Sequence, residues 1–273
     1  LSHELNYYYI LKKQGFLRNL IIRNTLGDEL RVILQVAEDR HELYELLDHI
    51  GSTFPEITSL RYVINNKGNE TFFDLPVKLH SGKPFITETM GDLQFRIGPK
   101  SFYQTNSTQA HEMYKLVRQL AGLSGKEVVY DLYTGTGTIA LFVASMAGKV
   151  VGIEQVPEAI DDAKINSEIN NIDNCHFYAG DTRKVLSEEF ISNHGAPDVL
   201  ITDPPRAGMH AEVVEQIARM APAHIIYVSC NPATQARDIA LLAEFYHIRS
   251  VHPVDMFPHT HHVESICLLE LRS

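Results

Sequence analysis

From residue 101 to about residue 244, short runs of strand-forming residues alternate regularly with segments whose apolar residues have helical spacing. Strands are predicted at 127–133, 149–155, 175–181, 198–204 and 224–230, and helices near 107–120, 138–147, 157–170, 210–220 and 233–244. Nearly continuous apolar strands that alternate with helices form a parallel sheet with helices on both faces. The pattern therefore predicts a Rossmann-like α/β fold.

The chain on either side of this region has a different pattern. Strands are predicted within 16–37, on both sides of a Gly-Asp turn, and at 58–65, 84–90 and 92–97. Residues 40–50 have the apolar spacing of an amphipathic helix. We predict a small α+β domain over 1–98 and the α/β domain over 99–273, with a tail of two strands joined by a loop rich in proline and histidine.

Composition and charge narrow the class of protein. Hydrophobic residues make up 44% of the chain, but no run approaches the ~18 apolar residues of a membrane helix, and the first residues lack a signal-peptide pattern. We expect a cytoplasmic protein with no membrane partner and with reduced thiols, since three scattered cysteines cannot form a disulfide framework. The net charge of −10 counts against a domain that holds nucleic acid by its phosphates.

The stretch DLYTGTGTIAL places Asp131 at a strand end and Gly135 and Gly137 at the turn into a helix. Glycines allow such a turn and a close approach of ligand to backbone. Glu154 and Asp181 end the next two strands, so three carboxylates are expected along one sheet edge. The glycine spacing also matches a dinucleotide fingerprint. A carboxylate at position 131 would repel a pyrophosphate and attract a sulfonium or ammonium group, which favours S-adenosylmethionine over NAD.

The fourth predicted strand runs into DPPRAGMH, which places Asp203 at the carboxyl edge of the sheet beside two prolines that fix the turn. We expect Asp203 to contact a planar polar group such as a nucleobase, although it could instead cap the helix that begins near His210. Methyltransferases that act on exocyclic amines often carry an aromatic residue where this chain has Arg206. A cation there suits an oxygen-rich base or a phosphate.

The fifth strand ends in IIYVSCNPAT, where Cys230 meets an Asn-Pro turn on the same edge of the sheet. This position favours an exposed, reactive thiol. Cys175 and Cys267 are flanked by ordinary strand sequence, and we expect them to be small buried side chains.

A carboxylate, Glu264, opens the last predicted strand. Three histidines precede it without the second ligand set of a zinc site, so no metal is predicted: His259, His261 and His262. A thiolate and a carboxylate together suit methylation of uracil at C5. Addition of the thiolate to C6 makes C5 nucleophilic, and a base must afterwards remove the C5 proton. Cys230 is the candidate nucleophile and Glu264 the candidate base.

These residues resemble the RumA/TrmA-type RNA uracil-C5 methyltransferases. The similarity runs from about Phe16 to the C-terminus and is carried by SFYQTN, DLYTGTGTIAL, GIEQVPEAIDDAKINSEINN, DPPRAG, SCNPATQARD and HTHHVE. The resemblance implies a class I methyltransferase sheet that binds S-adenosylmethionine. It assigns Cys230 as nucleophile and Glu264 as proton-abstracting base.

The resemblance also implies a set of ligand-binding residues. Cofactor contacts fall on Gln104, Tyr133, Glu154, Asp181 and Asp203. Phe102 and Gln104 belong to the loop that leads into the α/β domain, where Phe102 is expected at the substrate. The chain has Thr134 and Thr138 where the family commonly has Cys and Asn, so a cofactor contact through Thr138 is not expected.

Family members usually begin with an OB-like TRAM domain, often followed by cysteines that hold a 4Fe-4S cluster. Neither pattern occurs here, so the sequence resembles the C-terminal catalytic part of a longer enzyme. A TRAM domain in the missing part would supply RNA affinity, and any 4Fe-4S cluster would belong to that part. The tail is most similar to the ribosomal branch, so the expected substrate is a 23S rRNA uridine, with a tRNA uridine as second choice. An NAD-dependent oxidoreductase and a non-catalytic RNA-binding role are the remaining alternatives.

Overall fold

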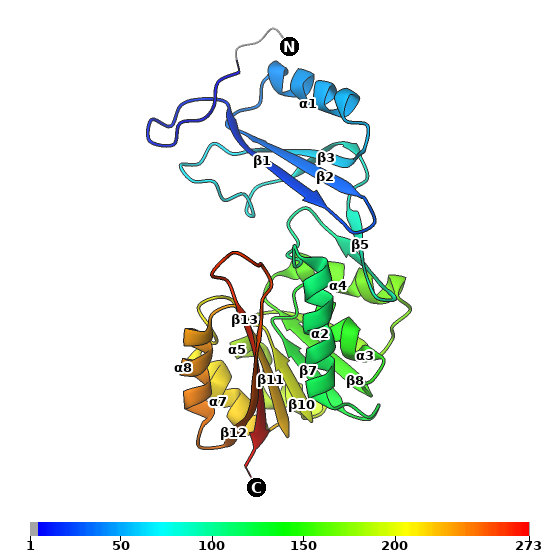
Figure 1. The fold of residues 1–273 in the computed structure, drawn as a ribbon, viewed down its shortest axis with the longest axis vertical. Helices are drawn as coiled ribbons and strands as arrows, with labels where there is room; N and C mark the ends of the chain where they lie inside the picture. Colours follow the sequence, from blue (N-terminus) through cyan, green and yellow to red (C-terminus); the bar gives the residue numbers. More distant parts are fainter. Residues whose placement is uncertain (1–4, 273) are drawn as a thin grey trace. The chain divides into compact units, whose positions relative to one another are not determined.

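The computed structural model describes residues 5–272. The chain divides into two compact units (Figure 1). Unit 1 comprises Leu1–Thr89 and Phe95–Lys100, and unit 2 comprises Met90–Gln94 and Ser101–Ser273. Each unit has a hydrophobic core of its own.

Unit 1 is built on a four-stranded sheet in the order β1-β2-β3-β4. Its elements are β1 (Leu17–Asn24), β2 (Leu30–Val36), α1 (His41–Thr53), β3 (Ile57–Ile64) and β4 (Lys78–Gly82). Leu43 and Leu47 of α1 pack against apolar side chains of β2 and β3 because both surfaces must leave water. The strand β4 was not predicted, since its sequence KLHSG is short and polar at an edge of the sheet.

A short two-stranded sheet, β5 (Ile86–Met90) and β6 (Leu93–Ile97), turns at Gly91 and Asp92. Gly91 has a φ of 60°, which glycine adopts without the penalty that a Cβ would bring.

Unit 2 contains a seven-stranded sheet in the order β12-β13-β11-β10-β7-β8-β9. Its strands are β7 (Val128–Leu132), β8 (Lys149–Glu154), β9 (Cys175–Ala179), β10 (Val199–Thr202), β11 (His224–Ser229), β12 (Tyr246–Val254) and β13 (Glu264–Leu271). β7 to β11 are parallel, whereas β13 runs antiparallel between β11 and β12. The strand order reverses between β7 and β10, and ligands bind at such a switch point in open α/β sheets.

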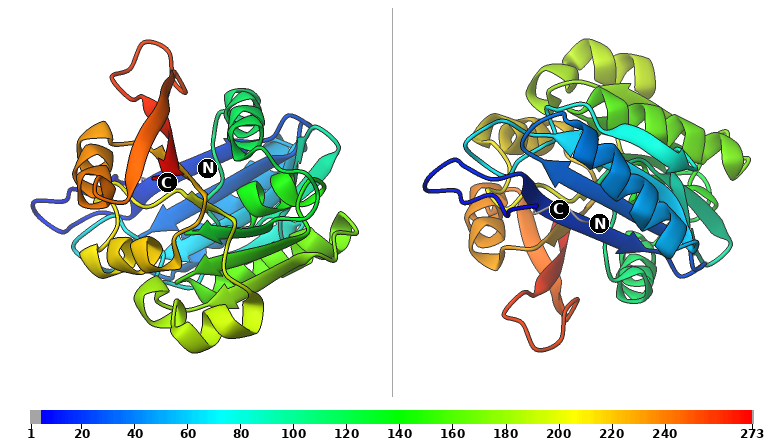
Figure 2. Two further views of the ribbon diagram at one scale, coloured as in Figure 1. Left: turned by 90° about the horizontal axis from the view of Figure 1, so that it is seen from below. Right: turned by 90° about the horizontal axis from the view of Figure 1, so that it is seen from above.

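Helices lie on both faces of this sheet (Figure 2). The helices of unit 2 are α2 (Ser107–Ala121), α3 (Thr138–Ala144), α4 (Pro157–Ile169), α5 (Thr182–Val185), α6 (Glu188–His194), α7 (Ala211–Met220) and α8 (Pro232–Leu242). α2 contacts α3 and α3 contacts α4, while α7 contacts both α5 and α8. The predicted Rossmann-like fold is confirmed. The short helices α5 and α6 were not predicted. α5 has only four residues, too few to show a helical period, and α6 has no buried residue that would mark an apolar face.

The predicted strands extend one to two residues too far at their carboxyl ends. Tyr133, Asp203 and Cys230 therefore lie in the loops just after β7, β10 and β11. This difference matters for function, because residues in these loops lie beyond the backbone hydrogen bonds of the sheet and their side chains are at its edge.

Candidate functional site

The carboxylate of Asp131 is completely buried at the end of β7. Its Oδ2 accepts hydrogen bonds from the Thr134 hydroxyl at 2.5 Å and from the Ala140 amide at 3.1 Å. Its Oδ1 is buried without a hydrogen-bond partner. Burial raises the pKa of Asp131 to about 7, against the two hydrogen bonds, which lower it. An acid with one unsatisfied buried oxygen is suited to a cationic ligand group.

Glu154 fixes the glycine loop to the end of β8. Its carboxylate accepts from the Gly135 amide at 3.2 Å and from the Val156 amide at 3.0 Å. Gly135 has a φ of 56°, and a Cβ at this position would meet no atom within 4 Å, so the space above its backbone is open. Gly137 has a φ of 80°, and there a Cβ would lie 3.0 Å from the Phe177 ring. One glycine faces open space and the other serves close packing.

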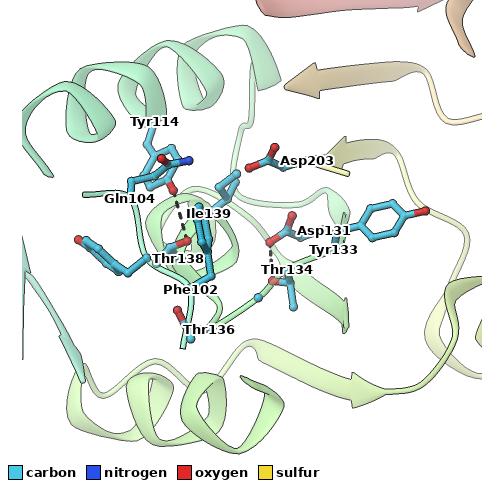
Figure 3. A pocket seen from close by; sticks show the side chains of 12 residues that line it. Phe102, Gln104, Tyr114, Asp131, Tyr133, Thr134, Thr136, Thr138, Ile139 and Asp203 are labelled. Carbon is cyan, nitrogen blue, oxygen red and sulfur yellow. Dashed lines mark hydrogen bonds between the residues drawn. The ribbon is translucent and has the colours of Figure 1, made fainter. Parts of the chain in front are cut away.

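A pocket opens at this loop (Figure 3). It is lined by Phe102, Tyr103, Gln104, Tyr114, Asp131, Tyr133, Thr134, Gly135, Thr136, Thr138, Ile139 and Asp203. In Figure 3, Tyr114, Gln104 and Thr138 lie on one side, and the carboxylates of Asp131 and Asp203 lie on the other. The pocket therefore has an acidic wall facing a wall of amide, hydroxyl and aromatic groups.

Asp203 is partly buried at the end of β10, at the switch point of the sheet. Burial, together with the charges of Glu264 and Asp131, raises its pKa to about 8. It does not cap the helix after the turn, because α7 is capped by His210, whose Nδ1 accepts from the Glu212 amide at 3.3 Å. The capping alternative for Asp203 is therefore wrong.

Cys230 and Glu264 both interact with the charged side chain of Arg206. The Cys230 thiol is partly buried directly after β11, and the neighbouring Glu264 opens β13. Burial raises the pKa of Cys230, the charge of Glu264 raises it further, and a hydrogen bond with the Arg206 guanidinium lowers it. Burial also raises the pKa of Glu264, while the charge of Arg206 opposes that shift. Arg206 further donates to His262 Nδ1 at 3.0 Å.

The backbone on both sides of Cys230 is fixed by short polar contacts. The Ser229 hydroxyl accepts from the Asn231 amide at 3.1 Å and donates to the Asn231 carbonyl at 3.1 Å. The Asn231 side chain caps α8 by accepting from the Ala233 amide. Cys230 thus occupies a rigid turn at the edge of the sheet.

Helix α8 holds the loop that carries Arg206. Asn231 Nδ2 and Thr234 Oγ1 donate to the Arg206 carbonyl at 3.1 and 3.2 Å. One turn further, Arg237 donates to the Ala207 carbonyl at 2.9 Å, and the buried Asp238 accepts from the Met209 amide at 2.8 Å. These contacts fix the loop that presents the guanidinium to the Cys230 thiol.

The predicted site residues fall into two sets. Five predicted cofactor residues line the pocket: Gln104, Asp131, Tyr133, Gly135 and Asp203. Gly137 and Glu154 support the loop from behind, and Asp181 caps α5 and forms an ion pair with Arg183, which lowers its pKa to about 2. Of the predicted substrate residues, Phe102 lines the pocket and is 72% exposed. Arg206 lies outside the lining, at Cys230.

Tyr133 has a backbone φ of 63°, a region that bulky residues seldom adopt. Its ring points away from the other lining residues in Figure 3. Burial, together with the charges of Asp238, Asp181 and Glu154, raises the pKa of its hydroxyl to about 12. Such strain at a ligand-facing loop is typical of functional sites.

Sequence reasoning missed part of the lining. Tyr114 lies on α2 and its hydroxyl is 3.4 Å from the Thr138 Oγ1. Thr138 lines the pocket although no role was expected for it. Tyr114 is buried and sits in the apolar spacing of an amphipathic helix, so nothing in the sequence separates it from a core residue. Among residues 5–272, no three His, Cys, Asp or Glu side chains converge as a metal site requires.

The chain belongs to the tRNA (uracil-5-)-methyltransferase family, whose model matches residues 78–272. The predicted resemblance is confirmed. An uncharacterized RNA methyltransferase of Bacteroides thetaiotaomicron is 58% identical over 99% of this chain and 61% of its own length. One of Porphyromonas gingivalis is 54% identical over 96% and 57%. The chain thus spans about three fifths of the length of these relatives.

Two solved structures place the fold. The Pyrococcus abyssi tRNA (uracil-54, C5)-methyltransferase, in complex with S-adenosyl-L-homocysteine, is 34% identical with a TM-score of 0.81. That likeness covers 97% of this chain and 63% of the other. The tRNA m1G37 methyltransferase of M. jannaschii shares the fold alone, at 13% identity and a TM-score of 0.57 over 100% of this chain and 81% of the other. Within the described residues, no helix is long and apolar enough to cross a membrane.

Proposed function

We propose that this chain methylates C5 of a uridine in RNA, using S-adenosylmethionine and a temporary bond between Cys230 and C6 of the base. The observation that carries the proposal is the grouping of a thiol, a carboxylate and a guanidinium beside an acidic pocket on one sheet edge. Unit 2 supplies all of these residues, and we assign the methyl transfer to it.

The residues of the pocket fit the cofactor. Bound there, S-adenosylmethionine supplies an electrophilic methyl group for C5 of the uracil. The buried Oδ1 of Asp131, which has no partner, would accept a hydrogen bond from an ammonium group or face a sulfonium. The open space over Gly135 admits a ligand against the backbone. Gln104 and Tyr133 would bound the pocket on either side.

The chain's own residues would carry the remaining steps. The Cys230 thiolate adds to C6, which places the electron pair of the C5–C6 bond on C5 and O4. After C5 has gained the methyl group, the Glu264 carboxylate removes the C5 proton. The resulting electron pair restores the C5–C6 double bond and expels the Cys230 thiolate. The uridine must leave its stack to reach the thiol.

Two RNAs are candidates. The tail sequence favours a 23S rRNA uridine, whereas the similarity to a tRNA (uracil-54, C5)-methyltransferase favours a tRNA uridine. Mass mapping of 5-methyluridine in both RNAs, from cells with and without the protein, separates them. Loss of the mark at one position identifies the substrate. Unchanged 5-methyluridine in both RNAs contradicts the proposal.

The mechanism is tested with transcripts of the mapped RNA that contain 5-fluorouridine. Fluorine at C5 permits thiolate addition and methyl transfer but leaves no proton for Glu264 to remove. We expect a denaturation-resistant protein–RNA adduct that requires S-adenosylmethionine and is absent from Cys230→Ala. Cys175→Ala is the matched control, because that thiol lies on β9 and is not one of the residues that line the pocket. An adduct with Cys230→Ala would contradict covalent catalysis by this residue.

A further inference from the structure

Residues 5–27 contain four basic residues and no acidic one, in a chain whose net charge is −10. Two of the four, Lys12 and Lys13, are exposed in a turn and take part in none of the ion pairs found within residues 5–272. The local charge of this segment is therefore opposite to that of the chain as a whole.

These lysines lie at the tip of an N-terminal hairpin, residues 5–17, which projects from the sheet of unit 1 (Figures 1 and 2). The Tyr8 amide donates to the Leu17 carbonyl at 2.7 Å, and the Tyr9 amide donates to the Gln14 carbonyl at 2.7 Å. Gly15 fits the return strand at a φ of 119°, where a Cβ would lie 2.1 Å from the Tyr7 carbonyl oxygen. The hairpin has a defined backbone.

Its three consecutive tyrosines differ in their surroundings. Tyr8 turns inward, where its ring lies 4.1 Å from the guanidinium of Arg18. Tyr7 and Tyr9 turn outward and are 83% and 52% exposed. Two phenol rings are thus exposed to water, and the Lys12 ammonium lies 5.6 Å from the centroid of the Tyr9 ring.

Arg18 braces this surface from beneath. Its side chain is fully buried and donates to the carbonyls of Asn65, Lys67 and Asn69 at 2.5 to 2.8 Å, and to Glu70 at 3.0 Å. One side chain therefore ties the Tyr8 ring to the loop after β3. That loop also approaches the hairpin tip, since a Cβ at Gly68 would lie 3.7 Å from Cε of Lys13.

We infer that Tyr7, Tyr9, Lys12 and Lys13 form a tyrosine–lysine surface that binds single-stranded RNA. Exposed aromatic rings stack on bases of any sequence, and neighbouring lysines neutralise phosphates. Duplex bases are already stacked, so a single strand or loop is the form that fits. The inference rests on the proposed function for the choice of RNA, and it locates a positive contact for phosphates on an acidic chain. A protein partner that covers the tyrosines is the competing outcome.

The test measures binding of a fluorescein-labelled single-stranded U12 oligonucleotide by anisotropy. We expect Tyr7→Ala/Tyr9→Ala to weaken binding by about 30-fold or more, given ~1–3 kcal/mol for each of two stacked bases. Lys12→Gln/Lys13→Gln should reduce the slope of log affinity against log salt by about 1.4, at ~0.7 per single-strand phosphate contact. Tyr8→Phe keeps the ring over Arg18, and Phe245→Ala removes an exposed ring of unit 2, so both should bind as the wild type does.

Unchanged U12 binding by the tyrosine variant, with an unchanged melting temperature, overturns the inference. Preferred binding of a U12·A12 duplex over single-stranded U12 also overturns it. So does a tyrosine variant that binds RNA as the wild type does but no longer binds a protein that the wild type retains. Methylation of the mapped RNA is measured on the same variants. If the tyrosine variant methylates the RNA at the wild-type rate and with unaltered KM, the result contradicts this surface but not the proposed function. If U12 binding depends on the tyrosines but the chain methylates no RNA, the result contradicts the proposed function but not this surface.

Discussion

The site has two halves on one edge of one sheet: a cofactor half around Asp131 and Glu154, and a reactive half formed by Cys230, Glu264 and Arg206. The two halves hold their charged groups in different ways. In the cofactor half, Asp131 accepts hydrogen bonds from the Thr134 hydroxyl and the Ala140 amide. Glu154 accepts from the amides of Gly135 and Val156. In the reactive half, Arg206 is the charged group that Cys230 and Glu264 share, and burial raises the pKa of both partners.

The difference teaches which half is complete before ligands arrive. Hydrogen bonds from the backbone fix the cofactor half in advance, so binding there costs little ordering of side chains. In the reactive half, burial raises the pKa of both the thiol and the carboxylate, and the charge of Arg206 opposes both shifts, so their ionisation responds to changes in nearby charge. We expect pH to act on chemistry through the reactive half and on cofactor affinity through Asp131.

The largest effect should follow replacement of the base. Glu264→Gln removes the proton acceptor but keeps the shape of the side chain, so methyl transfer proceeds and elimination stops. We expect turnover to fall about 10²- to 10⁴-fold, with a methylated RNA adduct that persists on denaturing gels. Glu270→Gln, on the same strand, is the control and should turn over normally. Loss of activity without any adduct would assign Glu264 to a step before addition.

A smaller effect is expected at the cofactor half. Asp131→Asn should weaken S-adenosylmethionine binding about 10- to 100-fold, the ~1.5–3 kcal/mol of a hydrogen bond to a charged group. Calorimetry should show wild-type affinity rising as pH increases through about 7, where Asp131 loses its proton. Asp131→Asn should lose that rise and keep only the change near pH 8 that Asp203 causes. Asp198→Asn, whose carboxylate caps the start of β7, is the control and should leave affinity unchanged.

The raised pKa of Asp131 also determines how the stability of the ligand-free chain changes with pH. Because burial raises the pKa of Asp131 from 3.8 to about 7, the stability that the neutral acid provides is lost as pH rises through that interval. The melting temperature of Asp131→Asn minus that of the wild type should therefore increase from pH 5 to pH 8. A difference that does not change with pH would show that the carboxylate is not shifted.

Much of this comparison could be predicted from the sequence, because parallel strands bring their carboxyl ends to one edge. The strand-ending residues Asp131, Glu154, Asp203 and Cys230 could be placed there from the alternating pattern alone. β4 and α5 could not, since short polar elements have no period to detect.

Contacts across the chain were beyond prediction. Tyr114 reaches the pocket from α2, and its position in the sequence is that of an ordinary core residue. Asp181 was predicted to end a strand, but it lies two residues beyond β9, and its carboxylate pairs with Arg183, a partner that only the turn into α5 brings close. The sequence placed Arg206 on the same sheet edge as Cys230, but only the structure shows that its guanidinium lies near enough to lower the pKa of the Cys230 thiol. Side-chain direction, not residue placement, is what the pattern leaves open.

Arg206 allows a sharper separation of the halves. Its hydrogen bond lowers the pKa of Cys230 against burial and the charge of Glu264, so Arg206→Gln should raise the thiol pKa. Arg206→Lys keeps a charge and should shift it less. Iodoacetamide labelling of the Cys230 peptide as a function of pH, read by mass spectrometry, measures the shift. Cofactor affinity should stay within twofold in both variants, and an equal loss of affinity would show that the halves are not separate.

The smallest effects distinguish the two glycines of the loop. Both have positive φ, so Ala at either costs about 1 kcal/mol of strain in the free energy of unfolding. At Gly137 the new Cβ would also lie 3.0 Å from Phe177 and 3.1 Å from Ala163, so Gly137→Ala should lower the melting temperature more than Gly135→Ala does. At Gly135 the Cβ enters open space that a ligand would fill, so that variant should lose more cofactor affinity by calorimetry. Equal losses of affinity at the two positions would mean that no ligand group lies over Gly135, and the cofactor half would then lack its backbone contact.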